Sequence, residues 1–416
     1  MNEYRYLSLL KVDQLPLTLI SEHFVIHYGL RNPRHGRGLG PSGVSDTILV
    51  RSYLSSLERL YRTMTGPPWN RPVPVTDGSR KTHVYVCDLS PVGDGSPFMA
   101  YDRNRIPYVA LSCRSSEPLN EAVMRRAAAE AVHEATHVLN FSKRPLYGPY
   151  SEPWAWLDEG LAVFMESRVL PGNQDYFRFL ADWIDVPGVS LNDWQAAYQA
   201  CLFLHYLSGR LGSDFPNRLW MDSEDSEMPL EALRRFMPLG LSFASADPEN
   251  RDLFGAGYVM DSYFLRDDRG GCFAPDLCTR FGDRAVVQSA VLSRGEECTV
   301  KGELPHLACH YFRVFPHRTV ERLRFTFRTL ANKSLAPFKA EVAIAGPDLS
   351  RGRVEVLRPP RTNTADGVSL ATEIGDLDQI DLHHLVLVVS NCDCREISRY
   401  NQTSTREPYE IQISAA

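Results

Sequence analysis

The stretch Ala131-Val-His-Glu-Ala-Thr-His-Val-Leu139 contains the pattern H-E-x-x-H, and the rest of the predicted fold is arranged around it. Residues four apart lie on one face of a helix, about 5–6 Å apart at Cβ. His133 and His137 can therefore both reach one zinc ion at about 2.0–2.1 Å. Glu134 follows the first histidine and is placed to accept a proton from water beside that ion.

The residues before this pattern predict that it lies on a helix. Asn120 is a capping residue, and the segment Glu121-Ala-Val-Met-Arg-Arg-Ala-Ala-Ala-Glu130 consists largely of strong helix formers. Neither glycine nor proline interrupts the chain before Pro145, and apolar residues recur with a helical period. We therefore predict one helix over residues 118–142.

A second segment, Trp154-Ala-Trp-Leu-Asp-Glu-Gly-Leu-Ala-Val-Phe-Met-Glu166, also predicts a helix, and residues 151–153 form its start signal. Glu159 lies within its apolar sequence, where a carboxylate is costly unless it is paired or binds a metal. Two histidines and one glutamate, with water in the fourth position, form the open ligand set of a catalytic zinc, whereas a structural zinc site is closed. We therefore predict one catalytic Zn²⁺ with the ligands His133, His137 and Glu159.

Together, the two motifs resemble those of the gluzincin metallopeptidases, especially the aminopeptidase N-like and peptidase-MA-like groups. The resemblance implies that Glu159 is the third zinc ligand and that Glu166 supports a ligand histidine. Such a carboxylate fixes the tautomer of the histidine. An exposed acid at the helix end is the alternative for Glu166. No third histidine follows His137 at the short interval of the metzincins, which argues against that branch.

A third segment, residues 198–212, resembles the helix that follows the metal site in that family. The resemblance implies that Tyr198 donates a hydrogen bond to the oxyanion of the tetrahedral intermediate, where charge develops. Tyr258 and His205 are weaker candidates for this role. The alternative for Tyr198 is an aromatic side chain packed on the core.

The sequence also departs from the family pattern. Aminopeptidases of this group carry a strand motif G-x-M-E-N, whose acid holds the free amine of the substrate. The nearest stretch, Gly95-Ser-Pro-Phe-Met-Ala-Tyr-Asp102, does not match it, which favours an endopeptidase over an aminopeptidase. The resemblance further implies a strand along the edge of the substrate cleft, and residues 106–112 are the candidate.

The remaining pattern predicts an α+β fold: a zincin-like catalytic domain, with a small mixed sheet plus helices, followed by an antiparallel β-sandwich. Strands of the first sheet are predicted over residues 23–28, 81–88 and 106–112. Further helices are predicted over residues 45–65, 229–236 and 252–264. Short strands separated by turns follow a polar segment at residues 266–278 and predict the sandwich.

We divide the chain accordingly into three parts. Residues 1–115 form the N-terminal α/β part of the catalytic domain, residues 116–268 its helical zinc-binding part, and residues 290–416 the β-sandwich domain. The chain has 416 residues, of which 44% are hydrophobic, enough for two or three domains.

The composition limits which kinds of partner and which cellular location are expected. The net charge of −6 and the lack of a long basic run argue against nucleic acid. No apolar run approaches 18 residues, so no membrane span is predicted. No secretory signal is visible, which favours the cytoplasm, although a mature secreted form stays open. The last third contains six cysteines that could form three disulfides, but the expected location favours reduced thiols: Cys272, Cys278, Cys298, Cys309, Cys392 and Cys394.

These observations predict a zinc-dependent metallopeptidase that hydrolyses a peptide or protein substrate by zinc-activated water, with Glu134 as the general base. Two alternatives stay open. One is a non-catalytic metal-containing binding protein that acts through its β-sandwich. The other is a zinc hydrolase of a non-peptide amide.

Overall fold

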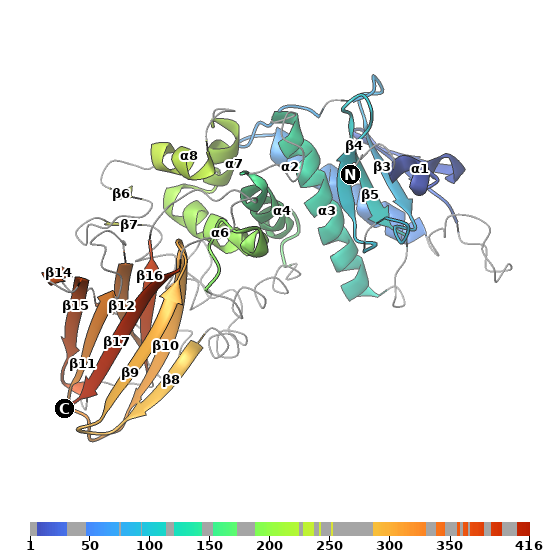
Figure 1. Cartoon of the computed structure of the whole chain (residues 1–416). Helices are drawn as coiled ribbons and strands as arrows, with labels where there is room; N and C mark the ends of the chain where they lie inside the picture. The colour runs from blue at the N-terminus through green and yellow to red at the C-terminus, as the bar shows by residue number, and fades with distance from the viewer. Residues whose placement is uncertain are drawn as a thin grey trace. The chain divides into compact units, whose positions relative to one another are not determined.

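Helices and strands alternate in the first part of the chain, and strands predominate in the last, as the α+β prediction requires (Figure 1). This computed structural model divides into unit 1, residues 1–178 and 214–225, and unit 2, residues 179–213 and 226–416. The predicted three-part division stays a prediction. The structure describes residues 6–30, 47–74, 76–92, 94–113, 120–143, 153–172, 188–223, 228–236, 241–242, 251–252, 286–329, 338–345, 356–357, 361–364, 367–377, 384–392 and 406–416.

Unit 1 is built on one mixed sheet with the strand order β1-β2-β3-β5-β4. Strands β2, β3 and β5 run parallel, and both edge strands are antiparallel to their neighbours. The strands are β1 (Leu17–Ile20), β2 (Phe24–Tyr28), β3 (Thr82–Cys87), β4 (Phe98–Tyr101) and β5 (Pro107–Ser112). The helices are α1 (Tyr6–Leu9), the 3-10 helix η2 (Val12–Gln14), α2 (Thr47–Thr65), α3 (Glu121–Lys143), α4 (Ala155–Val169) and α7 (Phe215–Met221).

The edge of this sheet differs from the expectation. Strand β5, the candidate for the edge, lies inside the sheet between β3 and β4, so β4 is the edge strand. Both β1 and β4 are four residues long and were not predicted, because so short a stretch shows no clear two-residue period. The stretch that fails to match the aminopeptidase motif therefore contains the edge strand itself.

Helix α3 lies at the centre of unit 1 and contacts α2, α4, β4 and β5. Its start follows the prediction, because Asn120 Oδ1 accepts a hydrogen bond from the backbone N–H of Val123 at 2.9 Å. Every residue from Ala127 to Phe141 except Glu130 is buried. Many of these residues are alanines, whose small side chains allow neighbouring elements to approach closely. Helix α4 begins at Ala155 and makes no side-chain cap at Trp154.

Unit 2 combines short helices with two five-stranded sheets. Its helices are the 3-10 helix η3 (Trp194–Ala196), α6 (Ala200–Leu211) and α8 (Pro229–Phe236). A small parallel pair joins β6 (Leu241–Ser242) and β7 (Arg251–Asp252). The strands of the two large sheets are β8 (Val286–Leu292), β9 (Glu297–Leu304), β10 (Ala308–Pro316), β11 (Leu323–Thr329), β12 (Phe338–Ala345), β13 (Val356–Leu357), β14 (Arg361–Thr364), β15 (Gly367–Ile374), β16 (His384–Asn391) and β17 (Glu407–Ala415).

The two sheets have the strand orders β13-β12-β16-β10-β8 and β14-β15-β11-β17-β9, and one hydrophobic core lies between them. This shared core makes them a sandwich. The second sheet is antiparallel throughout, and in the first sheet β8 runs parallel to β10. The predicted antiparallel sandwich is thus confirmed, with this one parallel pair as an addition that the sequence did not indicate. The chain reverses after β8 to form β9 in the opposite sheet and reverses again into β10, so β8 and β10 share one direction.

Other predictions fall partly outside the described residues. Apart from Asp252, which lies in β7, the helix predicted over residues 252–264 is outside them, and so is the boundary segment at residues 266–278. Of the six cysteines in the last third, Cys298 and Cys309 are free thiols, and Cys392 is buried. The other three lie outside the described residues.

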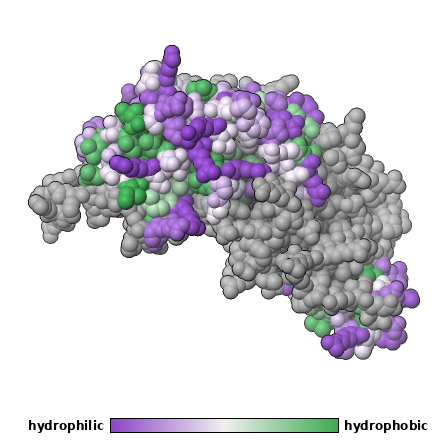
Figure 2. All heavy atoms as spheres, turned by 180° about the vertical axis from the view of Figure 1, so that it is seen from behind, coloured by the Kyte–Doolittle hydropathy of each residue, from purple (hydrophilic) through white to green (hydrophobic). Residues whose placement is uncertain are grey.

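On the face drawn in Figure 2, hydrophilic side chains are interrupted by small hydrophobic areas. Exposed large hydrophobic residues are scattered along the sequence, as is normal for a folded domain: Leu9, Ile20, Leu30, Ile48, Val73 and Val291. Within the described part of the chain, no helix has both the length and the apolarity needed to cross a membrane.

A glycine in the sandwich gives the first testable prediction. Gly302 lies opposite the fully buried Tyr409 in the β9–β17 pair. A Cβ atom at position 302 would lie 2.5 Å from the hydroxyl oxygen and 2.7 Å from Cζ of that tyrosine. Because the ring is enclosed by the core, Gly302→Ala is expected to lower the free energy of unfolding by about 1–3 kcal/mol, measured by denaturant titration.

The same substitution in a Tyr409→Leu background is the control. Without the ring, the added methyl group meets no such obstacle, so the double variant is expected to lose less stability than the sum of the two single losses. Strict additivity would show that the contact between the two residues is not the cause.

Candidate metal centre

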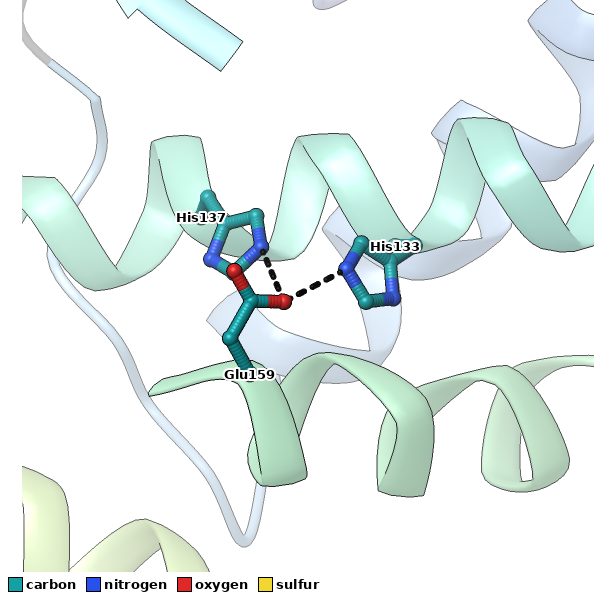
Figure 3. Close-up of side chains that lie close together, drawn as sticks. All are labelled: His133, His137 and Glu159. Carbon is teal, nitrogen blue, oxygen red and sulfur yellow. Dashed lines mark hydrogen bonds and ion pairs between the residues drawn. The ribbon is translucent and has the colours of Figure 1, made fainter. Parts of the chain in front are cut away.

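Helices α3 and α4 bring His133, His137 and Glu159 together in unit 1 (Figure 3). The two histidines lie one turn apart on α3, and both direct Nε2 toward Oε2 of Glu159 on α4. This oxygen lies 3.0 Å from His133 Nε2 and 3.5 Å from His137 Nε2. All three side chains are buried, and one potential ligand atom from each lies within 4.8 Å of the others.

These separations fit a metal ion. Ligand atoms bound tetrahedrally at about 2.0–2.2 Å lie roughly 3.3–3.6 Å apart, close to the two distances observed here. The donor set of two imidazoles and one carboxylate leaves a fourth position for solvent or substrate. The residues thus form a possible metal site with the H-x-x-x-H…E spacing of a zincin-like motif.

The other ring nitrogen of each histidine faces a second carboxylate. Nδ1 of His133 lies 2.9 Å from Oε1 of Glu166, and Nδ1 of His137 lies 3.1 Å from Oδ2 of Asp158. Glu166 can accept the Nδ1 proton of His133, and Asp158 lies within ion-pair distance of Nδ1 of His137. Both carboxylates favour the tautomer that leaves the lone pair of Nε2 for a metal. Glu166 is buried, so it is not an exposed helix-end acid.

Sequence analysis did not single out Asp158. Its signal is present, because it directly precedes Glu159 within an apolar sequence, where an unpaired carboxylate is costly. The two acids project from adjacent positions of α4 and meet different nitrogens of the same histidine, His137.

The carboxylates control the charge of the two histidines. Burial lowers the pKa of His133, but hydrogen bonds to Glu159 and Glu166 outweigh burial and raise it to about 10. Burial also lowers the pKa of His137, but the charges of Asp158 and Glu159 outweigh burial and raise this pKa well above its usual value. Burial also works against the ionised form of Glu159, yet the histidines hold its pKa at about 2. A divalent cation would take the place of these protons, so metal uptake should release them.

Glu134, the predicted base, lies on α3 within the same buried region. Its pKa is raised by burial, which outweighs the opposing effect of the two histidines. The backbone N–H of Met99 in β4 donates a hydrogen bond to its carboxyl group. The oxygen Oε2 is buried and has no hydrogen-bond partner among the residues that the structure describes. A buried oxygen of this kind is free to take a proton from a bound water.

The predicted oxyanion donors lie elsewhere in the chain. Tyr198 is half-buried in the turn before α6, and His205 is buried within that helix, both in unit 2. Tyr258 is outside the described residues. The roles of all three stay predictions.

Comparison with known proteins adds little to this geometry. No curated protein sequence matches the chain. Among solved structures, the periplasmic inhibitor of g-type lysozyme PliG from Aeromonas hydrophila matches with 9% identity over 31% of this chain and 99% of that chain, at a TM-score of 0.17. A similarity this low supports no conclusion about the present chain. Residues 119–242, which contain the complete triad but less than half of the chain, match a family described as a family of unknown function, DUF6055.

Proposed function

We propose that this protein is a zinc-dependent metallopeptidase. The observation that carries the proposal is the arrangement around Glu134: a triad able to hold zinc lies beside a buried carboxylate oxygen with no described partner. A metal held for structural reasons alone would need no such base. The match to a family of unknown function neither supports nor opposes this activity.

Each residue then has a defined task. Zinc, when bound by His133, His137 and Glu159, would acidify a water molecule and polarise the carbonyl of the scissile bond. Glu134 would take the proton of that water and later deliver it to the leaving amine. Burial raises the pKa of Glu134, which favours its holding the proton until the proton is delivered to the leaving amine. Tyr198 is the proposed donor to the oxyanion.

The edge strand favours a peptide over other amides. Among the described strands, β4 pairs with β5 alone, and the backbone N–H of Met99 in β4 donates a hydrogen bond to Glu134. An extended peptide can add to such an edge by backbone hydrogen bonds, which would align its carbonyl groups along the metal site. The strand sequence Phe-Met-Ala-Tyr contains no acid to hold a free amine, which favours cleavage within a chain over removal of its first residue.

The test is a peptide library with unbiased sequence and blocked ends. The zinc-loaded protein is expected to cleave internal bonds, a chelator to abolish cleavage, and added zinc to restore it. Blocked ends separate an endopeptidase from an aminopeptidase. A zinc-loaded protein that cleaves no peptide would contradict the proposal and favour the binding protein. Hydrolysis of non-peptide amides alone would favour the other alternative.

A further inference from the structure

A buried arginine lies behind the metal centre in unit 1. The side chain of Arg71 is almost wholly enclosed, and its guanidinium lies 5.8 Å from the ring centroid of Trp69 and 5.9 Å from that of Trp220. Burial lowers the pKa of Arg71 to about 9, although the charge of Asp158 opposes this effect. A buried guanidinium is costly unless its donors are used, so these contacts call for an explanation.

The guanidinium of Arg71 donates hydrogen bonds to two asparagines on different helices. Nε donates to Oδ1 of Asn217 on α7 at 2.8 Å, and Nη1 donates to Oδ1 of Asn140 on α3. The hydrogen bond to Asn217 does not lead to the metal centre, because Nδ2 of Asn217 donates to the backbone oxygen of Trp69 at 2.6 Å. The hydrogen bond to Asn140 does lead to the metal centre.

Asn140 connects Arg71 to a metal ligand. Its Nδ2 donates to Oδ1 of Asp158 at 2.5 Å, and Oδ2 of Asp158 lies 3.1 Å from Nδ1 of His137. A guanidinium only donates and an ionised carboxylate only accepts, so the amide of Asn140 has one possible orientation between them. The hydrogen bonds therefore run in one direction, from Arg71 through Asn140 to Asp158. An ion-pair contact then joins Asp158 to His137, whose Nε2 faces Glu159.

We propose that Arg71 is a positioning residue of the metal centre, which acts through Asn140 to hold Asp158 against His137. The inference rests on the proposed zinc site, but not on peptide cleavage. Asp158 has two oxygens and could rotate about its side-chain torsion. Asn140, which is held in place by the buried Arg71, binds Oδ1 of Asp158 and so keeps Oδ2 beside His137. His137 is thereby held ready before any metal arrives.

Two asparagines provide a matched pair of variants. Both Asn140 and Asn217 are buried, and each accepts one hydrogen bond from Arg71 and donates one further hydrogen bond. Asn140→Ala and Asn217→Ala should therefore lower the melting temperature by similar amounts. Only Asn140→Ala interrupts the path to His137. Zinc affinity of the full-length protein, measured by chelator competition, is expected to fall about 10–100-fold in Asn140→Ala and to stay unchanged in Asn217→Ala.

The visible absorption spectrum of the cobalt-loaded protein gives a second readout, because it reports the geometry of the ligands and not stability. It should change in Asn140→Ala and in Arg71→Met, and not in Asn217→Ala. The milder pair Asn140→Ser and Asn217→Ser serves the same comparison if either alanine variant does not fold.

Equal zinc affinities in the two asparagine variants, with unchanged cobalt spectra, would overturn the proposal and leave Arg71 a purely structural residue. Equal losses in both variants would do the same. Neither result depends on catalysis. A wild-type protein that binds zinc and cleaves no peptide would defeat the proposed peptidase function, while the comparison of the two variants would still decide the role of Arg71.

Discussion

Glu134→Gln is expected to reduce peptide hydrolysis by about 10²–10⁴-fold while the zinc content stays that of the wild type. The glutamine amide has nearly the same shape as the carboxylate, and its oxygen can still accept the hydrogen bond from the backbone N–H of Met99. The amide cannot, however, accept a proton from water. The side chain does not belong to the triad, so the metal ligands are unaffected. Single-turnover cleavage of a library-derived peptide and metal analysis of the same sample measure the two quantities.

Glu130→Gln is the matched control for this prediction. Glu130 lies one turn earlier on α3, is only partly buried and is not part of the triad. Its variant should keep both zinc and activity. Full activity in Glu134→Gln would remove Glu134 from the mechanism, whereas loss of zinc in that variant would show that the residue helps to bind the metal.

Glu159→Gln is expected to abolish stoichiometric zinc binding, and activity with it. Oε2 of Glu159 is the atom on which both Nε2 nitrogens converge, and it supplies the negative charge of the proposed ligand set. A neutral amide is a far weaker ligand for zinc than a carboxylate. Metal analysis after dialysis against zinc at a concentration near that of the protein measures the loss.

Glu166→Gln distinguishes a ligand from a supporting residue. Glu159 and Glu166 are both buried on α4, and both contact His133. Glu159 contacts Nε2, whereas Glu166 contacts Nδ1, on the side of the ring away from the triad. Its variant should keep zinc with affinity lowered about 10–100-fold. If Glu166→Gln lost the metal and Glu159→Gln kept it, the assignment of the third ligand would be wrong.

The helical elements of the site could be predicted well from the sequence. The alanine-rich segment after Asn120 and the apolar segment around Glu159 each have a strong local signal, and both form helices close to the predicted bounds. The strands were harder to predict. Strand β4 was missed because it is short, and the parallel direction of β8 depends on two chain reversals that no local pattern encodes.

The carboxylates that contact Nδ1 of the two histidines could be predicted only in part. The family resemblance pointed to Glu166 but not to Asp158, although both lie in the quoted motif. Arg71 gave no signal, because an arginine after a turn is normally a solvated residue. Its partners, Asn140 and Asn217, lie 69 and 146 positions away in the chain. Burial of the guanidinium becomes evident only when α3, α7 and the segment after α2 pack together.

The sequence by itself determined that His133 and His137 share one face of a helix and that Glu159 lies on a second helix. These follow from backbone geometry and residue preferences, which act over a few positions. Only the tertiary structure decided which oxygen both imidazoles meet, which acid holds each Nδ1, and which strand forms the edge beside Glu134. Those relations depend on contacts between segments distant in the chain, and such contacts form only when burial of apolar surface brings the segments together.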